Sequence, residues 1–393
     1  MSQQMVIIGA GLAGLSAACT AARQGWQVWL CSSLPSERAQ SVMAEGGINA
    51  ALDTQGQEDS PARHGADTLR AACGLADPNA VLAMTAAAPA LVEELADLGV
   101  PFNRTADGQI DLRYFGGQKK KRTAFSQSDT GKQLMTALID AVRRYEAEGT
   151  VRRLNHHDFL TLLHDGPVCT GASLRDTWSG EQCDLPAQAV IIASGGLHGL
   201  FSCTTGSLAD TGAVTAELFR LGLPVANGEF IQYHPTTIAS NGKRMLVSEA
   251  ARGEGGRLWV RKQGRPWYFM EEKYSELGNL MPRDVTAREI WYHCQAGETV
   301  WLDLTGLEED IFSRKLSGLV ADCLLYGGVD IRCQPIAVAP GIHYFMGGLY
   351  VDEWHRTPWK HLYAAGECAC QYHGANRLGG NSLLGAIYGG RKA

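Results

Sequence analysis

The stretch Val6-Ile7-Ile8-Gly9-Ala10-Gly11-Leu12-Ala13-Gly14-Leu15 lies almost at the start of the chain and decides the fold. The apolar run from Met5 to Ile8 predicts a buried strand of a parallel sheet. The glycines that follow let the chain turn and bring bare backbone N–H groups against a pyrophosphate. We therefore expect a dinucleotide-binding turn built on Gly9, Gly11 and Gly14.

The sequence around this turn has the order of strand, helix and strand that a dinucleotide site requires. A helix is predicted from Leu12 to Gln24, ended by Gly25, and residues 27–31 supply the second strand. An acidic residue that would bind a ribose is missing at the end of this strand, where Ser32 stands. Nicotinamide cofactors are thereby disfavoured, and the sequence favours FAD.

Composition excludes several classes of function. The chain has 393 residues and a formal net charge of -6, which gives no reason to invoke nucleic acid. Its only basic run, 119–122, predicts a solvated face. Eleven cysteines without a CxxC spacing predict neither a disulfide framework nor a zinc or iron–sulfur site. No metal site is expected, so an electron-transfer metal would belong to a partner.

The uncharged stretch from Met5 to Ala22 is long enough to suggest a membrane span. Its glycine spacing explains the small residues by close backbone approach instead. No basic region precedes the apolar stretch, as it would in a secretory signal. We expect a cytoplasmic protein with no membrane span of its own.

Strand and helix patterns predict a chain that leaves its first domain and returns to it. Long helices are predicted at 77–98 and 131–148, a small antiparallel insertion over 151–163 and 172–177, and further parallel strands at 189–193 and 361–365. From Glu229 the pattern becomes irregular, with aromatic, His, Arg and Gly residues interleaved. We predict an α/β fold with a Rossmann-like FAD-binding domain of glutathione-reductase type at 1–228 and 341–393, interrupted by an α+β capping domain at 229–340.

Motifs spread over nearly the whole chain resemble those of one enzyme family. They are FIQYHPT at 230–236, LVSEAARGEGG at 246–256, PRD at 282–284, LDL at 302–304, HYFMGG at 343–348 and HGANRLGGNSL at 373–383. In this order they resemble the flavoproteins of fumarate reductase, succinate dehydrogenase and L-aspartate oxidase. The chain is similar to a short soluble fumarate-reductase-like flavoprotein.

In that family the cap closes over a small dicarboxylate lying on FAD. The resemblance implies that Arg377 and His343 bind one carboxylate of the substrate. It also implies that His234, Ser248 and Glu249 hold the other end. A dianion needs fixed donors at both ends, and the planar guanidinium of arginine matches a carboxylate.

The resemblance further implies a proton donor. Arg283 would protonate fumarate during its reduction to succinate, with Glu249 and Arg252 as a relay. An arginine has a pKa above about 12. Hydride transfer to one alkene carbon, however, leaves carbanionic character on the next, which is basic enough to take a proton from a guanidinium group.

FAD would be bound along the first domain. The glycine turn would contact the pyrophosphate, Glu367 the ribityl chain, and a second pair of glycines the ring. The residues implied are Gly9, Gly11, Gly14, Ser32, Gly46, Gly47, Glu367, Ser382 and Leu383.

One departure from the family concerns how FAD is attached. Members with covalent FAD carry a histidine a few residues before the AEGG segment at 44–47, and this chain has Gln40 there. Glutamine cannot form the histidyl bond, so we predict non-covalent FAD. In the family, loss of that bond makes the flavin a weaker oxidant, and Glu45 is typical of fumarate reductases. Both features favour fumarate reduction over succinate oxidation.

Alternative functions stay open. L-aspartate oxidase also has free FAD, but its members carry Glu where Phe115 precedes two glycines here, and phenylalanine cannot pair with a substrate ammonium. A succinate dehydrogenase-type flavoprotein is a second alternative. A non-catalytic flavin-binding or electron-transfer component is a third, although flavin binding alone would not require the whole substrate-binding set.

The family usually continues into a C-terminal helical domain that helps to dock an electron-transfer subunit. We predict that this domain is absent, because the chain given stops at Ala393. The electron donor, an iron–sulfur protein or another partner, is not identified by the sequence. Such a partner would also decide whether the protein associates with a membrane.

Overall fold

A parallel sheet forms the centre of the first lobe. The computed structural model describes residues 3–240 and 242–393. The sheet has the strand order β19-β10-β1-β2-β6, and every neighbouring pair is parallel. From edge to edge the strands are β19 (Leu362–Ala364), β10 (Ala189–Ile192), β1 (Gln4–Ile8), β2 (Gln27–Ser32) and β6 (Val151–Asn155). The predicted α/β fold class is confirmed.

The strand β1 is buried from Met5 to Ile8 because both faces of the sheet are covered. Ile7 packs in a core shared with the helices, whereas Val6 and Ile8 pack in a second core on the opposite face. The period of two along a strand produces this division. The predicted buried strand at this position is therefore confirmed.

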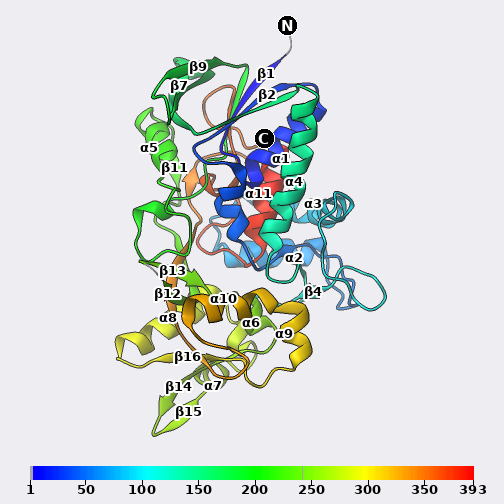
Figure 1. Cartoon of the computed structure of the whole chain (residues 1–393), viewed down its shortest axis with the longest axis vertical. Helices are drawn as coiled ribbons and strands as arrows, with labels where there is room; N and C mark the ends of the chain where they lie inside the picture. The colour runs from blue at the N-terminus through cyan, green and yellow to red at the C-terminus, as the bar shows by residue number, and fades with distance from the viewer. Residues whose placement is uncertain (1–2, 241) are drawn as a thin grey trace.

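Helices cover one face of the sheet. They are α1 (Leu12–Arg23), α2 (Pro61–Ala71), α3 (Pro78–Asp97), α4 (Thr130–Ala147) and α11 (Asn381–Lys392). The first and the last of them, α1 and α11, lie side by side (Figure 1), and the Ser16 hydroxyl donates to the Ile387 carbonyl at 2.9 Å. The two ends of the chain thus build one half-domain together.

A small antiparallel sheet covers the other face. Its strands are β7 (His157–Asp165), β8 (Val168–Asp176) and β9 (Gln182–Pro186). The sequence predicted that this insertion begins at residue 151, and this was wrong for residues 151–155. These residues form β6, which extends the parallel sheet beside β2. The strand alternation was recognised, but it does not encode which neighbour a strand pairs with.

The second lobe is built on an antiparallel sheet at the opposite end of the molecule (Figure 1). Its strand order is β13-β12-β17-β16-β14-β15. The strands are β12 (Ile231–Ser240), β13 (Lys243–Leu246), β14 (Arg257–Lys262), β15 (Arg265–Trp267), β16 (Val300–Asp303) and β17 (Ile336–Phe345). The expected boundary at residue 340 falls within β17, which continues to Phe345.

Helices of this lobe cover its sheet and enclose a separate apolar core. They are α6 (Ala250–Gly253), α7 (Phe269–Lys273), α8 (Arg283–Gln295), α9 (Glu309–Lys315) and α10 (Ser317–Gly327). The first lobe has one further helix, α5 (Ala213–Arg220). Its short strands are β3 (Ile48–Asn49), β4 (Leu112–Arg113), β5 (Thr123–Ala124), β11 (Val225–Ala226) and β18 (Gly348–Leu349).

Among the described residues, no helix combines the length and the apolar character needed to cross a bilayer. The basic run 119–122 was expected to be a solvated face, and this was wrong for Arg122. That side chain is fully buried, and its guanidinium contacts Asp59 at 3.0 Å and Asp67 at 2.8 Å.

Candidate active site

A cavity of about 810 Å³ lies at the carboxyl ends of the parallel strands. Its wall includes Gly9 after β1, Ser32 at the end of β2, Gly195 after β10 and Glu367 after β19. Ligands of open α/β sheets bind at this edge. The volume lies within the range typical of cofactor pockets.

The glycine turn after β1 allows two close backbone approaches. A Cβ at Gly9, whose φ is +112°, would lie 2.1 Å from the Ala193 carbonyl oxygen. A Cβ at Gly14 would lie 1.8 Å from the Gly9 carbonyl oxygen, so Gly14 brings α1 against the turn. Gly11 lines the cavity just before α1 begins, where the helix N-terminus favours an anion.

The second pair of glycines packs against protein groups. A Cβ at Gly46 would lie 2.5 Å from the Phe115 ring, and one at Gly47 would lie 2.5 Å from the Ala124 carbonyl oxygen. The residues that line the cavity next to this pair are Ala44 and Glu45. The two glycines therefore let the backbone pass closely between neighbouring segments.

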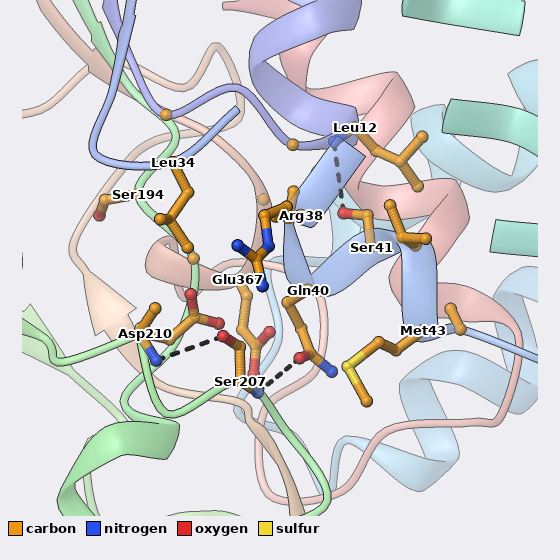
Figure 2. Close-up of a pocket in the computed structure, with 18 of the residues that line it drawn as sticks. Leu12, Leu34, Arg38, Gln40, Ser41, Met43, Ser194, Ser207, Asp210 and Glu367 are labelled. Carbon is orange, nitrogen blue, oxygen red and sulfur yellow. Dashed lines mark hydrogen bonds between the residues drawn. The ribbon is translucent and has the colours of Figure 1, made fainter. Parts of the chain in front are cut away.

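Gln40 opens onto the cavity from the short helix η2 (Gln40–Met43). Its side-chain oxygen accepts the Ser207 backbone N–H at 2.6 Å, a contact drawn in Figure 2. Nearby, burial and then the carboxylates of Asp322 and Asp129 raise the pKa of Glu45 well above its usual value. This environment favours the uncharged form of Glu45.

The first turn of α11 lies at the cavity with Ser382 and Leu383 on its wall. Arg377, which also lines the cavity, donates from Nη1 to the Ser382 hydroxyl at 2.7 Å. Its guanidinium stacks on the Tyr344 ring, with 4.2 Å between the guanidinium carbon and the ring centroid. Burial and the charge of Arg283 lower the pKa of Arg377 to about 9. The Nε of Arg377 is buried without a hydrogen-bond partner among the described residues.

A buried ion triad lies in the second lobe. Glu249 Oε2 accepts from Nε of Arg283 at 2.9 Å and from its Nη2 at 2.7 Å. The other oxygen, Oε1, accepts from Arg252 Nη2 at 3.1 Å and from the Gly116 backbone N–H at 3.1 Å. Burial alone would raise the pKa of Glu249, but Arg283 and then Arg252 outweigh it and hold the pKa at about 2. One carboxylate therefore bridges two arginines that are 31 residues apart in sequence.

Gln232 connects this triad to the cavity. Its side-chain oxygen accepts from Arg283 Nη1 at 3.1 Å, and its amide donates to the Arg377 carbonyl oxygen at 2.7 Å. The sequence did not single out this glutamine, although it lies in the FIQYHPT motif. Its role depends on a contact that sequence spacing does not encode.

Two histidines lie between the triad and the cavity. The rings of His234 and His343 are 5.0 Å apart, centroid to centroid, and His343 lines the cavity. The His343 Nδ1 hydrogen-bonds with the Thr205 hydroxyl at 2.8 Å. Burial and the charge of Arg283 lower the pKa of His234 well below its usual value, so His234 is neutral. Its Nε2 is buried and has no hydrogen-bond partner within residues 3–240 and 242–393.

The remaining predicted side chains lie near these groups. Ser248 is buried directly before Glu249, and its hydroxyl accepts the Ala250 backbone N–H at 3.4 Å. Ser32 donates to the Leu34 carbonyl oxygen at 2.7 Å on the cavity wall. Glu367 Oε1 accepts the Phe345 backbone N–H at 3.0 Å.

Comparison with known proteins places this geometry in a family. A family model described as an FAD binding domain matches residues 4–383. The chain belongs to that family. It is 44% identical to the succinate dehydrogenase flavoprotein subunit of Bacillus subtilis, over 100% of this chain and 69% of that subunit.

Other relatives of this FAD-binding chain have different names. The L-aspartate oxidase of Mesorhizobium japonicum is 38% identical over 97% of the chain and 72% of the oxidase. Among solved structures, a mutated FrdA of E. coli quinol fumarate reductase has a TM-score of 0.90 at 31% identity, over 100% of this chain and 69% of FrdA. The predicted resemblance is confirmed, and the chain is an FAD-dependent oxidoreductase of the fumarate reductase and succinate dehydrogenase type.

The residues present fit FAD. The cavity extends from the glycine turn to the N-terminus of α11. Backbone N–H groups are available for binding at the turn, and Ser382 lies in the first turn of α11. Gly9 leaves no room for a side chain at this turn. Two helix N-termini therefore meet one cavity, which suits a ligand that carries a pyrophosphate.

Proposed function

We propose that this flavoprotein reduces fumarate, or a close unsaturated dicarboxylate, to the saturated acid. The observation that carries the proposal is the buried Arg283–Glu249–Arg252 triad, connected through Gln232 to Arg377 at the cavity. Burying three charged side chains carries a desolvation cost that ion pairing offsets only in part, so stability alone does not account for the triad. Flavin binding alone would not require them.

The substrate is held through groups that lack protein partners. His234 Nε2 and Arg377 Nε are buried and unpaired among the described side chains. Each is a hydrogen-bond donor or acceptor whose burial is costly until a ligand satisfies it. His343 adds a third contact from the cavity wall, and Ser248 lies beside Glu249. A dicarboxylate supplies an anionic group for each end of this set.

Reduction adds a hydride to one alkene carbon and a proton to the other. Bound FAD, once reduced by an electron donor, would supply the hydride. Arg283 supplies the proton, Glu249 then transfers a proton from Arg252 to restore it, and Arg252 regains a proton from solvent before the next turnover. The low pKa of Glu249 makes its protonated form a short-lived intermediate, so the proton rests on the arginines. Burial of the triad excludes water from these transfers.

Non-covalent FAD is part of this proposal. Gln40 faces the cavity where the resemblance expects a histidine, and its amide is held by Ser207. A carboxamide has no nucleophile suited to a flavin bond. The weaker oxidant that results favours fumarate reduction, although succinate dehydrogenases are among the relatives.

A partner protein would supply the electrons. Several relatives are named subunits, including the 8-methylmenaquinol:fumarate reductase flavoprotein subunit of Wolinella succinogenes. We propose that this chain likewise accepts electrons from an iron–sulfur or other redox partner. Any membrane association would then occur through that partner.

The test is anaerobic. The flavin of purified holoprotein is reduced, fumarate is added, and absorbance of the oxidised flavin is followed by stopped flow. Rapid reoxidation that is lost in Arg283→Ala supports the proposal. If L-aspartate instead bleaches the oxidised flavin, the proposed reaction becomes that of the L-aspartate oxidases among the relatives. No response to either substrate, in a protein that retains FAD, would overturn the proposed reaction.

A further inference from the structure

Two carboxyl groups that the proposed reaction does not use, those of Asp210 and Glu367, lie on one wall of the cavity, and His198 lies against Glu367. His198 is fully buried, with its Nε2 3.3 Å from Glu367 Oε1 and its Nδ1 2.8 Å from the Thr204 hydroxyl. Burial would lower the pKa of His198, but the Glu367 carboxylate raises it above its usual value. The Glu367 carboxylate thus contacts His198 and accepts the Phe345 backbone N–H.

Asp210 lies on the same wall of the cavity, but its carboxyl group has no comparable contact among the described residues. Figure 2 draws it with Ser207, Gln40 and Glu367 in one part of the pocket. Its Oδ2 is buried and has no hydrogen-bond partner among the residues described. A Cβ at Gly195 would lie 3.5 Å from this oxygen, so the carboxyl group faces the turn that follows β10. A buried polar atom without a partner, on the wall of a cofactor cavity, indicates a contact with the ligand.

The charge of Asp210 depends on pH near neutrality. Burial and then the Glu367 carboxylate raise the pKa of Asp210 to about 7, although His198 opposes the shift. Below this pH the carboxyl group is neutral and can donate a hydrogen bond. Above it, two carboxylates face the cavity together.

We propose that Asp210 contacts bound FAD as a neutral carboxylic acid, and that loss of its proton weakens FAD binding. FAD is an anion that offers hydrogen-bond acceptors, so the neutral acid attracts it. A carboxylate beside Glu367 would repel the anion. The proposal rests on the proposed non-covalent attachment, because a covalently bound flavin has no dissociation equilibrium.

The cavity wall carries further charged groups of both signs, including the acidic side chain of Asp158. Lys243 faces His198, and the Arg38 guanidinium points into the pocket (Figure 2). Two groups compete with Asp210 as the source of a pH dependence. The proton of His198 also leaves as the pH rises, and Arg377, with its pKa of about 9, begins to lose its charge at the upper end of the titration.

The experiment measures the FAD dissociation constant of apoprotein from pH 5.5 to 8.5 by quenching of flavin fluorescence. The wild-type constant is expected to be flat below about pH 7 and to rise by up to about tenfold per pH unit above it. Asp210→Asn, a neutral donor at every pH, keeps the low-pH affinity throughout. Glu367→Gln moves the midpoint to lower pH, since it removes the charge that adds to burial in raising the pKa of Asp210.

Exposed Asp184 provides the matched control, and Asp184→Asn should follow the wild-type curve. Circular dichroism confirms that each variant folds. A flat wild-type curve, or a rise that persists in Asp210→Asn, overturns the assignment; a persistent rise would come from His198 or Arg377 instead. Before this titration, the holoprotein is denatured in acid. Flavin that stays with the polypeptide overturns both the attachment and the inference, whereas released FAD with a flat curve overturns the inference alone.

Discussion

Replacement of Glu249 by glutamine tests the buried triad most directly. The variant Glu249→Gln keeps the shape of the side chain and removes its charge. The carboxylate accepts two hydrogen bonds from Arg283, at 2.9 and 2.7 Å, and one from Arg252 at 3.1 Å. A glutamine places an NH2 group, which only donates, against guanidinium donors. Two buried cations then lack a counter-charge, which costs about 3–5 kcal/mol of unfolding free energy.

The same change interrupts the proposed relay. Loss of a positioned proton-transfer group slows a reaction by about 10²–10⁴-fold. Urea denaturation measures the stability loss, and stopped-flow reoxidation of reduced flavin by fumarate measures the rate. Glu146→Gln is the matched control, since Glu146 binds Arg153 through Nε at 2.8 Å and Nη2 at 2.7 Å on a partly exposed face. Glu146→Gln should lower the free energy of unfolding by about 1 kcal/mol or less and leave the rate of flavin reoxidation unchanged.

Two outcomes would refute this reasoning. Unfolding of Glu249→Gln within about 1 kcal/mol of wild type would mean that the arginines are not held by this carboxylate. A wild-type rate of flavin reoxidation in a stable variant would mean that the proton reaches the substrate by another route.

Three further predictions follow from the same contacts. Arg377→Lys should raise the KM for fumarate about tenfold or more, because a lysine lacks the planar fork that also binds Ser382; an unchanged KM in steady-state assays would contradict this. Gly9→Ala should abolish FAD binding in fluorescence titrations, since its Cβ would lie 2.1 Å from the Ala193 carbonyl oxygen; a variant that still binds FAD would show that the turn can shift. The triad should stabilise the fold fully above the unfolded-state carboxyl pKa of about 4.3 and lose that effect as the pH falls toward 2; thermal melts of wild type and Glu249→Gln should converge there, and curves that stay parallel would argue against it.

The first half-domain could be predicted because its information is local. The apolar run Met5–Ile8 and the glycines after it indicate a strand and a turn without any knowledge of distant residues. Sequence patterns did not predict which distant segments and side chains contact one another. Val151–Asn155 was recognised as a strand, yet its pairing with β2 depends on where the chain returns in space. The sequence predicts a solvent-exposed Arg122, because the acidic partners of this side chain, Asp59 and Asp67, lie more than 50 residues away in the chain.

The candidate site divides in the same way. Arg283, Glu249 and Arg252 are implied by the resemblance of two motifs. The contact between Glu249 and Arg252 is local, because they are three residues apart, whereas the contact between Glu249 and Arg283 forms only in the folded chain. Asp210 precedes a helix in the sequence and carried no signal of its own. Its position becomes informative once Glu367, from the far end of the chain, lies on the same wall.

The pairing of α1 with α11 has a consequence for biosynthesis. When a ribosome has made the first 360 residues, the glycine turn and the whole second lobe exist, but β19, Glu367 and the first turn of α11 do not. The second lobe contains its own apolar core and a contiguous run of chain, so it can fold while synthesis continues. The flavin pocket cannot close until residues 361–393 emerge and pack against elements that were synthesised earlier. FAD therefore binds only after residues 361–393 have been synthesised and have folded onto the first lobe.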